Sequence, residues 1–358
     1  MPSINILTWH NGSGLQQDSQ CLADILTRAG FTVIQTDLRP SRHKHQRLSR
    51  FGLLGRLWEK SIQIYQSYRY RARKKLNFVT QKTYLYDVNL FLEFVDTRRF
   101  SQARKNCFIP NQEWFSSWRH LTLKSFDQIL CKTLHAYDIF QRLGHSTSYI
   151  SFTSPDRYRY EFKTDYNTCL HLAGRSPLKG TQAILDVWRQ HPEWPQLYVI
   201  QRSSHAPVAW LPDNISYIQK HVDLEVLTEM QNRCGLRIQT SEAEGFGHVL
   251  VEGMSCGAVM VTTDAPPMHE IVTPDRGFLV AYDRSTPKDL GRRYYVDPDQ
   301  LEKQLDSIFR LSLEQRRKIG QRARDWYLEN DHLFKQNIIQ VMHDLLKHNL
   351  NDISKHYD

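Results

Sequence analysis

The stretch that decides the fold is residues 241–264, Ser-Glu-Ala-Glu-Gly-Phe-Gly-His-Val-Leu-Val-Glu-Gly-Met-Ser-Cys-Gly-Ala-Val-Met-Val-Thr-Thr-Asp. A short run with alternating apolar positions, 236–238, precedes it and predicts a strand. Glycine-rich turn chemistry follows, then a helix over 248–256 and a buried parallel strand over 258–263. Backbone N–H groups at such a helix start lack intrahelical partners and lie at the positive end of the helix dipole. The stretch therefore predicts a parallel α/β sheet with a seat for phosphate.

Two carboxylates flank this seat. Glu244 lies in the loop and Glu252 lies in the expected helix, eight positions later. A carboxylate accepts paired hydrogen bonds from a vicinal diol, as the acidic residue of dinucleotide-binding folds does with ribose. The alternative is that both are solvated charges beside a helix start, because short motifs also match by chance. The residues alone leave both interpretations open.

The whole stretch resembles the Glu-x7-Glu signature of retaining GT-B glycosyltransferases, the group often called family 4, with Glu244 and Glu252 as its two glutamates. The resemblance implies a nucleotide-sugar-dependent enzyme in which Glu244 lies near the transferred sugar and Glu252 binds the ribose hydroxyls. The continuation at 262–270 is similar to a subgroup of bacterial and viral sequences, with His269 where Asn is expected. The resemblance further implies donor contacts for Gly245, Phe246, Gly247, His248 and Val249, and for Lys220 and His221 beside the nucleotide base.

A second loop, Gly-Arg-Ser-Pro-Leu-Lys-Gly at 174–180, lies between an expected strand at 168–172 and an expected helix at 181–189. Two cations at a helix start suit a diphosphate leaving group, on which negative charge builds as the glycosidic bond breaks. The alternative is two solvated loop cations. The loop resembles the family's Gly-Arg-x-x-x-x-Lys-Gly sequence, with one residue fewer between the cations. This resemblance implies catalytic roles for Arg175 and Lys179.

The N-terminal half opens with a βαβ pattern: a strand over 4–9, a helix over 17–29 and a strand over 31–35. Gly12 and Gly14 in the first loop permit close approach of a ligand, although a tight turn explains them equally well. The resemblance implies that the loop of Gly14 is on the substrate side and contacts the donor.

Glu113 follows an expected strand at 106–110, and strand ends carry ligands in open α/β sheets. We therefore expect Glu113 and Asn111 at the edge of a cleft, where the resemblance implies contact with sugar or acceptor and a catalytic role for Glu113. Nearby aromatic side chains form either an acceptor platform or part of the core, and these are Trp114, Phe115 and Trp118.

A basic segment at 42–75 holds eleven Lys and Arg residues and one acidic residue, Glu59, interleaved with Leu, Trp and Tyr. Such a pattern suits an anionic membrane surface or anionic acceptor. It also fits a solvated helical face with a buried stripe, and it fits nucleic acid, where cations neutralise phosphates and aromatics stack on bases. We rank these interpretations in that order.

With 358 residues, 40% of them hydrophobic, the chain is too long for one compact core. No apolar run is long enough for a membrane span and no signal peptide precedes the first strand, so we expect a cytoplasmic protein, peripheral at the inner membrane face. The six cysteines contain no CxxC pair, which argues against a zinc site and a disulfide framework. We expect no metal and no cofactor, only a nucleoside diphosphate sugar as co-substrate.

The predicted fold class is α/β of the GT-B type, with two Rossmann-like domains whose parallel sheets face an interdomain cleft. We place an acceptor-side domain at 1–155, a nucleotide-sugar domain at 156–330, and a helix at 331–358 that the resemblance implies packs back on the first domain. The predicted reaction is transfer of a sugar to an acceptor hydroxyl with retention, in glycan or glycolipid biosynthesis. The alternatives are another GT-B activity such as an epimerase or phosphorylase, a glycosyltransferase that modifies nucleic acid, or a degenerate GT-B binding module.

Overall fold

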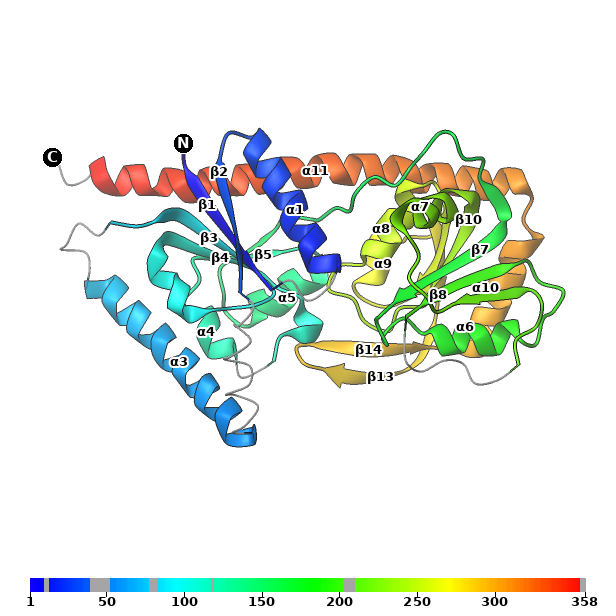
Figure 1. Ribbon diagram of the computed structural model, residues 1–358, viewed down its shortest axis with the longest axis horizontal. Coiled ribbons are helices and arrows are strands. Elements are labelled where there is room, and N and C mark those ends of the chain that lie inside the picture. Colours follow the sequence, from blue (N-terminus) through cyan, green and yellow to red (C-terminus); the bar gives the residue numbers. More distant parts are fainter. Residues whose placement is uncertain (10–12, 39–51, 77–82, 117–118, 203–209, 355–358) are drawn as a thin grey trace. The chain divides into compact units, whose positions relative to one another are not determined.

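The structure is a computed structural model that describes residues 1–9, 13–38, 52–76, 83–116, 119–202 and 210–354. The chain divides into two compact α/β units (Figure 1). Unit 1 comprises Met1–Ser151 together with Phe334–Asp358, and unit 2 comprises Phe152–Leu333. The sequence analysis placed its boundaries at 155/156 and 330/331.

In the described part of unit 1, six parallel strands form a sheet in the order β2-β1-β3-β4-β5-β6. The carboxyl-terminal halves of its central strands β3 and β4 are buried, and there each strand combines apolar residues with one buried asparagine, Asn89 or Asn106. The order reverses between β1 and β3, where Ile4 pairs with Val88. The strands are β1 Ser3–Thr8, β2 Thr32–Asp37, β3 Tyr86–Leu92, β4 Ala103–Ile109, β5 Gln128–Cys131 and β6 Thr147–Tyr149.

The helices of unit 1 connect these strands. The expected helix at 17–29 begins earlier, at Ser13, so Gly14 lies in its first turn and not in the preceding loop. Ser and Gly are weak helix formers, which is why propensity alone favoured a later start. Gly12 lies outside the described residues. The helices are α1 Ser13–Arg28, α3 Gly52–Leu76, η2 Thr97–Gln102, η3 Gln112–Trp114, α4 His120–Leu123 and α5 Leu134–Arg142.

In the described part of unit 2, a second parallel six-stranded sheet has the order β12-β11-β10-β7-β8-β9. The chain enters at the central strand β7, builds one edge, and returns to build the other from β10. A separate antiparallel hairpin, which the sequence did not reveal, is formed by β13 Tyr282–Lys288 and β14 Gly291–Val296. The sheet strands are β7 Asp165–Gly174, β8 Leu197–Gln201, β9 Ile215–Ile218, β10 Cys234–Gln239, β11 Val259–Thr263 and β12 Gly277–Val280.

The helices of unit 2 pack closely on its sheet. Helix α8 ends at Ser255 with Cys256 as its C-cap, and Gly257 follows with a φ of 71°, the left-handed conformation that commonly stops a helix. A Cβ atom at Gly253 would lie 2.6 Å from Met260 Sδ, so this glycine lets α8 approach β11. The helices are α6 Thr181–Trp188, α7 Leu224–Arg233, α8 His248–Ser255, α9 Met268–Ile271, α10 Pro298–Arg310 and the first part of α11 Leu313–Ser354, which continues into unit 1 from Phe334.

Helix α11 corrects one prediction. A helix was expected at 331–358, but a single helix of 42 residues, Leu313–Ser354, begins well before that start. Asn330, a polar residue just before the expected start, is buried within it, and its Nδ2 donates to Phe152 O at 2.7 Å. The part of α11 that belongs to unit 1 packs there, with the His343 ring centroid 5.1 Å from that of Phe31.

Within the described residues, no helix combines the length and the apolar composition needed to cross a membrane. All six cysteines are free thiols, five of them are buried, and Cys21 is partly exposed.

Candidate active site

The point in unit 2 where the strand order reverses lies between β7 and β10. In open α/β sheets, ligands bind outside the carboxyl ends of the strands at such a point. The loop after β7 carries Lys179, and the loop after β10 carries Glu244. The two loops are joined, because Glu242 N–H donates to Leu178 O at 2.9 Å. Two motifs that are distant in sequence therefore meet at this edge of the sheet.

Lys179 and Glu244 form an ion pair between Nζ and Oε1, and each side chain is about 11% exposed. Arg175, from the same loop as Lys179, is exposed and makes no hydrogen bond or ion pair with any residue that the structure describes. The charge of Lys179 is thus balanced within the site. Among these three residues, Arg175 is the one that keeps an uncompensated charge for a ligand.

Gly180 determines how closely the two loops approach. Its φ is 63°, and a Cβ atom there would lie 2.2 Å from Thr240 O and 2.6 Å from Thr240 Oγ1. An L-residue would meet both a left-handed backbone and a backbone oxygen. Glycine at this position therefore allows the loop of Lys179 to pass over the end of β10 and places Lys179 against Glu244.

His171 links the first residue of α6, Thr181, to the backbone of β10 through two hydrogen bonds. Its Nδ1 lies 2.7 Å from Ile238 O and its Nε2 lies 2.8 Å from Thr181 Oγ1. A carbonyl oxygen only accepts, so Nδ1 carries the hydrogen and Nε2 accepts from the Thr181 hydroxyl. Complete burial lowers the pKa of His171 to about 4, so the ring is neutral at physiological pH. The sequence analysis did not identify this residue.

Glu252 lies in α8, and both of its carboxylate oxygens have partners. Arg157 Nη2 donates to Oε1 at 3.1 Å and Gln231 Nε2 donates to Oε2 at 3.1 Å. Arg157 Nε also donates to Oε1, at 3.4 Å. The carboxylate is thus held in place by Arg157 and Gln231.

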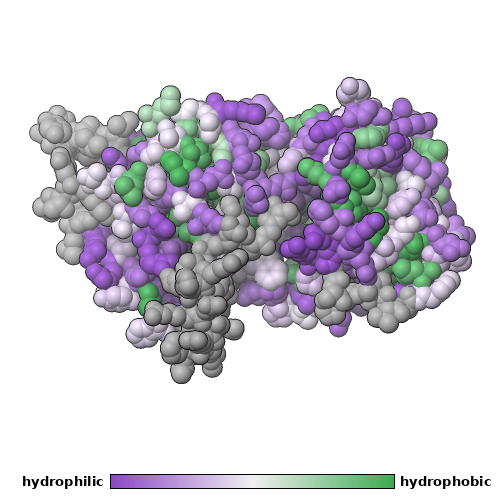
Figure 2. Space-filling view, in the orientation of Figure 1, coloured by the Kyte–Doolittle hydropathy of each residue, from purple (hydrophilic) through white to green (hydrophobic). Residues whose placement is uncertain are grey.

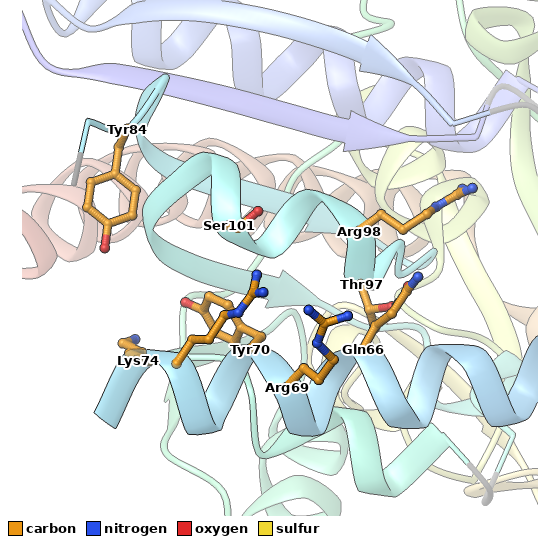
Figure 3. A pocket seen from close by; sticks show the side chains of 9 residues that line it. Gln66, Arg69, Tyr70, Lys74, Tyr84, Thr97, Arg98 and Ser101 are labelled. Carbon is orange, nitrogen blue, oxygen red and sulfur yellow. The ribbon is translucent and has the colours of Figure 1, made fainter. Parts of the chain in front are cut away.

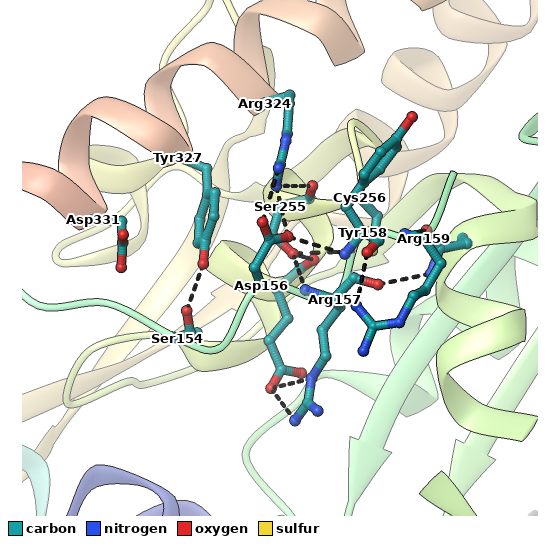
Figure 4. A network of polar contacts seen from close by, with 12 residues as sticks. Ser154, Asp156, Arg157, Tyr158, Arg159, Ser255, Cys256, Arg324, Tyr327 and Asp331 are labelled. Atoms are coloured by element: carbon teal, nitrogen blue, oxygen red, sulfur yellow. Dashed lines mark hydrogen bonds and ion pairs between the residues drawn. The ribbon is translucent and has the colours of Figure 1, made fainter. Parts of the chain in front are cut away.

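Arg157 is itself held by α8 and α11. Its N–H donates to Ser255 Oγ at 3.0 Å, and the neighbouring Asp156 accepts two bonds from Arg324, at 2.7 and 2.8 Å (Figure 4). The sequence analysis assigned Arg157 no role. No spacing rule connects it to Glu252, which lies 95 positions later.

The residues between the two glutamates either have side chains that pack in the protein or shape the start of α8. Phe246 is buried against Phe152, with ring centroids 5.4 Å apart, and Val249 packs on a small apolar cluster of β7 and β8. Gly247 is the N-cap of α8, with a φ of 116°, and Gly245 is buried next to it. His248 begins the helix, and its Nδ1 lies 2.8 Å from Ser154 Oγ. Phe246 and Val249 therefore have backbone atoms, rather than side chains, to offer a donor.

Lys220 and His221 lie beyond β9, the edge strand of the sheet. Both side chains are exposed. His221 Nδ1 lies 3.4 Å from Arg202 Nη1, at the end of β8. These residues are separated from the reversal point by two strands. The fold thus places them at the same edge of the sheet as the loops of Lys179 and Glu244, but further along it.

Glu113 and Gly14 belong to unit 1, unlike the other predicted site residues. Glu113 is a buried residue of η3, next to Asn111, whose Nδ2 donates to Glu93 Oε2 at 2.7 Å. Lys132 Nζ donates to Asn111 Oδ1 at 3.2 Å and to Asp18 at 2.7 Å. These residues form a polar cluster at the carboxyl edge of this sheet. The sequence analysis identified Asn111 and Glu113 but not Glu93, Lys132 and Asp18, because these three belong to no recognisable motif.

The aromatic residues beside Glu113 differ in their exposure to solvent. Phe115 is buried in the core of unit 1, whereas Trp114 is 44% exposed. Trp118 lies outside the described residues. The core interpretation therefore holds for Phe115, and the acceptor platform stays a prediction for Trp114.

Residues 209–326 match the sequence profile of the family described as Glycosyl transferases group 1. The chain carries a glycosyl transferases group 1 domain. This domain lies within unit 2 and contains Glu244 and Glu252 of the predicted signature, while Arg175 and Lys179 precede it. The predicted relation to group 1 glycosyltransferases and the predicted class of enzyme are confirmed, and the assignment to the retaining family 4 stays a prediction. No curated protein sequence matches the chain.

Several solved structures are similar to the chain over nearly its whole length. HepE of Anabaena, in complex with UDP and glucose, is 16% identical over 96% of this chain and 100% of its own, with a TM-score of 0.65. Sucrose-phosphate synthase of Thermosynechococcus elongatus is 14% identical over 99% and 100%, with a TM-score of 0.66. An E. coli structure described as trehalose-6-phosphate bound with UDP-2-fluoro glucose is 11% identical over 96% and 98%, with a TM-score of 0.66. The predicted GT-B fold is confirmed, and the predicted interdomain cleft stays a prediction.

Proposed function

We propose that the chain transfers a sugar from a nucleoside diphosphate sugar to an acceptor hydroxyl, with retention of configuration. The observation that carries this proposal is the meeting of the Lys179 and Glu244 loops at the strand-order reversal of unit 2. Similar folds hold UDP with glucose in HepE and UDP-2-fluoro glucose in the E. coli structure, which supports a UDP-sugar as donor.

The donor diphosphate would lie between Arg175 and the N-terminus of α8, where unpaired N–H groups and the helix dipole favour an anion. As the bond from the sugar to the phosphate oxygen breaks, negative charge grows on that oxygen and is stabilised by Arg175 and Lys179. The acceptor oxygen forms the new bond on the same face, and its proton passes to the leaving phosphate. Protein cations supply the charge that a divalent ion would supply, so we propose that the reaction needs no metal and that EDTA leaves turnover unchanged.

Glu252 would bind the ribose. Arg157 and Gln231 fix the orientation of its carboxylate, and an ionised carboxylate accepts paired hydrogen bonds of the kind that two adjacent hydroxyls donate. In this scheme Glu252 meets the substrate and Arg157 keeps the carboxylate oriented. Glu244 would face the transferred sugar, with its charge balanced by Lys179.

The test removes the cations of the site one at a time. Arg175→Ala and Lys179→Ala should each lower kcat/KM by roughly 10²-fold, the effect of losing one electrostatic stabiliser. Lys318→Ala, an exposed cation of α11, is the control and should change nothing. Product is detected by mass spectrometry after incubation with a panel of nucleotide sugars and acceptors. Unchanged turnover in both site variants would refute the assignment.

We propose further that the acceptor is a glycan or a lipid-linked molecule and that the enzyme works at the cytoplasmic face of an anionic membrane. The support lies in α3, the described part of the basic segment, because it exposes Trp58, Tyr65 and Tyr68 beside its cations. Aromatic and basic side chains together suit a headgroup layer. If the protein retards DNA with a steep salt dependence and ignores anionic vesicles, the alternative of a nucleic-acid-modifying transferase replaces this proposal.

A further inference from the structure

A second concave site lies in unit 1, away from the residues discussed above. It is a pocket of about 280 Å³ between α3 and η2 (Figure 3). Tyr70 and Lys74 lie on its α3 side, and Thr97, Arg98 and Ser101 lie on its η2 side. Its described lining contains four cations and no acidic residue, and the cations are Arg69, Arg73, Lys74 and Arg98.

Two of these four charges are balanced by neighbours. Lys74 Nζ lies 2.6 Å from Asp127 Oδ1. Arg98 donates from Nε and Nη2 to the two oxygens of Asp96, both at 2.7 Å. These two cations therefore contribute little net charge to a ligand.

The other two charges are not balanced. Arg69 and Arg73 form no ion pair with any residue in the described part of the chain, and Arg69 instead lies 5.7 Å from the centroid of the Tyr65 ring. They are four positions apart on one helix, an arrangement in which like charges repel by about 0.2–0.5 kcal/mol. A bound anion would remove this repulsion.

The walls of the pocket are fixed by hydrogen bonds. Thr97 Oγ1 donates to Gln66 Oε1 at 2.9 Å, which ties η2 to α3. Asn106, fully buried, donates from Nδ2 to the Tyr70 hydroxyl oxygen at 2.9 Å, which holds that ring in place. The pocket is thus formed by two elements that are bonded to each other, and it differs from a row of cations on an open helical face.

We propose that this pocket binds a phosphate-bearing anion through Arg69 and Arg73. The planar guanidinium fork matches two phosphate oxygens at once, and the hydroxyl groups of the lining offer further donors. Its volume is just below the roughly 300–1,000 Å³ of pockets that enclose drug-sized ligands. A phosphate or diphosphate group fits such a space, and a whole nucleotide sugar does not.

The phosphate has two sources, a lipid headgroup or a soluble phosphate ester, and the chemistry of recognition is the same for both. The surface around α3 is mostly hydrophilic on the face that Figure 2 shows, with exposed aromatics on the same helix, so both sources have access. The site does not depend on the proposed transferase reaction, because none of its residues belongs to unit 2.

The test measures phosphate binding in a background that lacks the proposed donor cations. All proteins carry Arg175→Ala and Lys179→Ala, so the donor site does not contribute. The pocket variant adds Arg69→Gln with Arg73→Gln. The control adds Arg28→Gln with Arg142→Gln, which removes the same charge from two exposed positions of unit 1 outside the pocket. Calorimetry with pyrophosphate forms one arm, and sedimentation with phosphatidylcholine vesicles, with and without phosphatidic acid, forms the other.

The pocket variant should bind at least about tenfold more weakly than the control, because it loses charge-assisted hydrogen bonds. If the pocket variant loses affinity only for pyrophosphate, the ligand is a soluble phosphate ester. If it loses affinity only for phosphatidic acid vesicles, the ligand is a lipid headgroup. If it loses affinity for both, the pocket recognises the phosphate group from either source. The proposal is overturned if neither ligand binds the background protein, or if the pocket variant and the control lose binding equally.

Discussion

Gly180→Ala offers a quantitative test of how the candidate active site is assembled. An added Cβ would lie 2.2 Å from Thr240 O, a backbone atom that cannot rotate away. Gly174, the last residue of β7, provides a matched control at the other end of the same loop. Its φ of 56° is close to the 63° of Gly180, but a Cβ there would have no atom within 4 Å. The two substitutions therefore share the backbone strain and differ in the steric overlap.

The magnitudes follow from these two terms. A left-handed conformation costs an L-residue roughly 1–2 kcal/mol, and both variants lose this amount. Overlap in a well-packed region adds about 1–3 kcal/mol, and only Gly180→Ala carries it. The free energy of unfolding of unit 2 should thus fall by about 2–5 kcal/mol for Gly180→Ala and by about 1–2 kcal/mol for Gly174→Ala.

Urea titration followed by tryptophan fluorescence measures the difference, because Trp188 and Trp194 lie in the core of unit 2. The midpoint should fall further for Gly180→Ala than for Gly174→Ala, with the same slope. Equal midpoints would show that the loops separate without cost. The close approach of Gly180 to Thr240 would then not position Lys179.

Three further predictions concern single residues. Because burial lowers the pKa of His171, its neutral ring contributes fully to the free energy of unfolding above the ordinary pKa of 6.5, and about 3 kcal/mol is lost as pH falls towards about 4. Urea midpoints at several pH values should show this loss, and His171→Gln should make the midpoint depend less on pH. Glu252→Gln should raise the donor KM and leave kcat nearly unchanged, as expected of uniform binding, whereas a fall in kcat alone would assign it to catalysis. A thiol reagent should label Cys21 first in the native protein and all six cysteines after denaturation. The reason is that burial shields the other thiols and raises their pKa, that of Cys131 to about 12. Rapid labelling of several thiols in the native protein would contradict the buried positions.

The region around the Glu-x7-Glu signature was predictable from sequence to within one or two residues. The expected helix at 248–256 is α8, His248–Ser255, and the expected strand at 258–263 is β11, Val259–Thr263. Glycines mark the turns there, and the strand residues are uniformly apolar or Thr. Local propensity and burial thus indicate the same elements, and tertiary contacts do not alter them.

The central strand β3 of unit 1 escaped prediction because polar residues interrupt it. Asn89 is fully buried, and its Nδ2 donates to Asn106 Oδ1 at 3.0 Å while its Oδ1 accepts from Asn5 Nδ2 at 3.1 Å. These amides lie on three neighbouring strands and satisfy one another only when the sheet has formed. A buried polar side chain is stable when it is paired, and the sequence does not say which partner will pair with it.

What the sequence determined by itself was the order of elements around the two loops of the candidate site and the residue types that these loops carry. Arg175, Lys179, Glu244 and Glu252 could be placed in their loops or helix because turn signals and periodicity act between near neighbours. Only the tertiary structure decided which charges meet. It pairs Lys179 with Glu244 and joins Arg157 to Glu252 across 95 positions. The partner of a buried charge depends on packing between segments that are distant in the chain, and no local pattern records that packing.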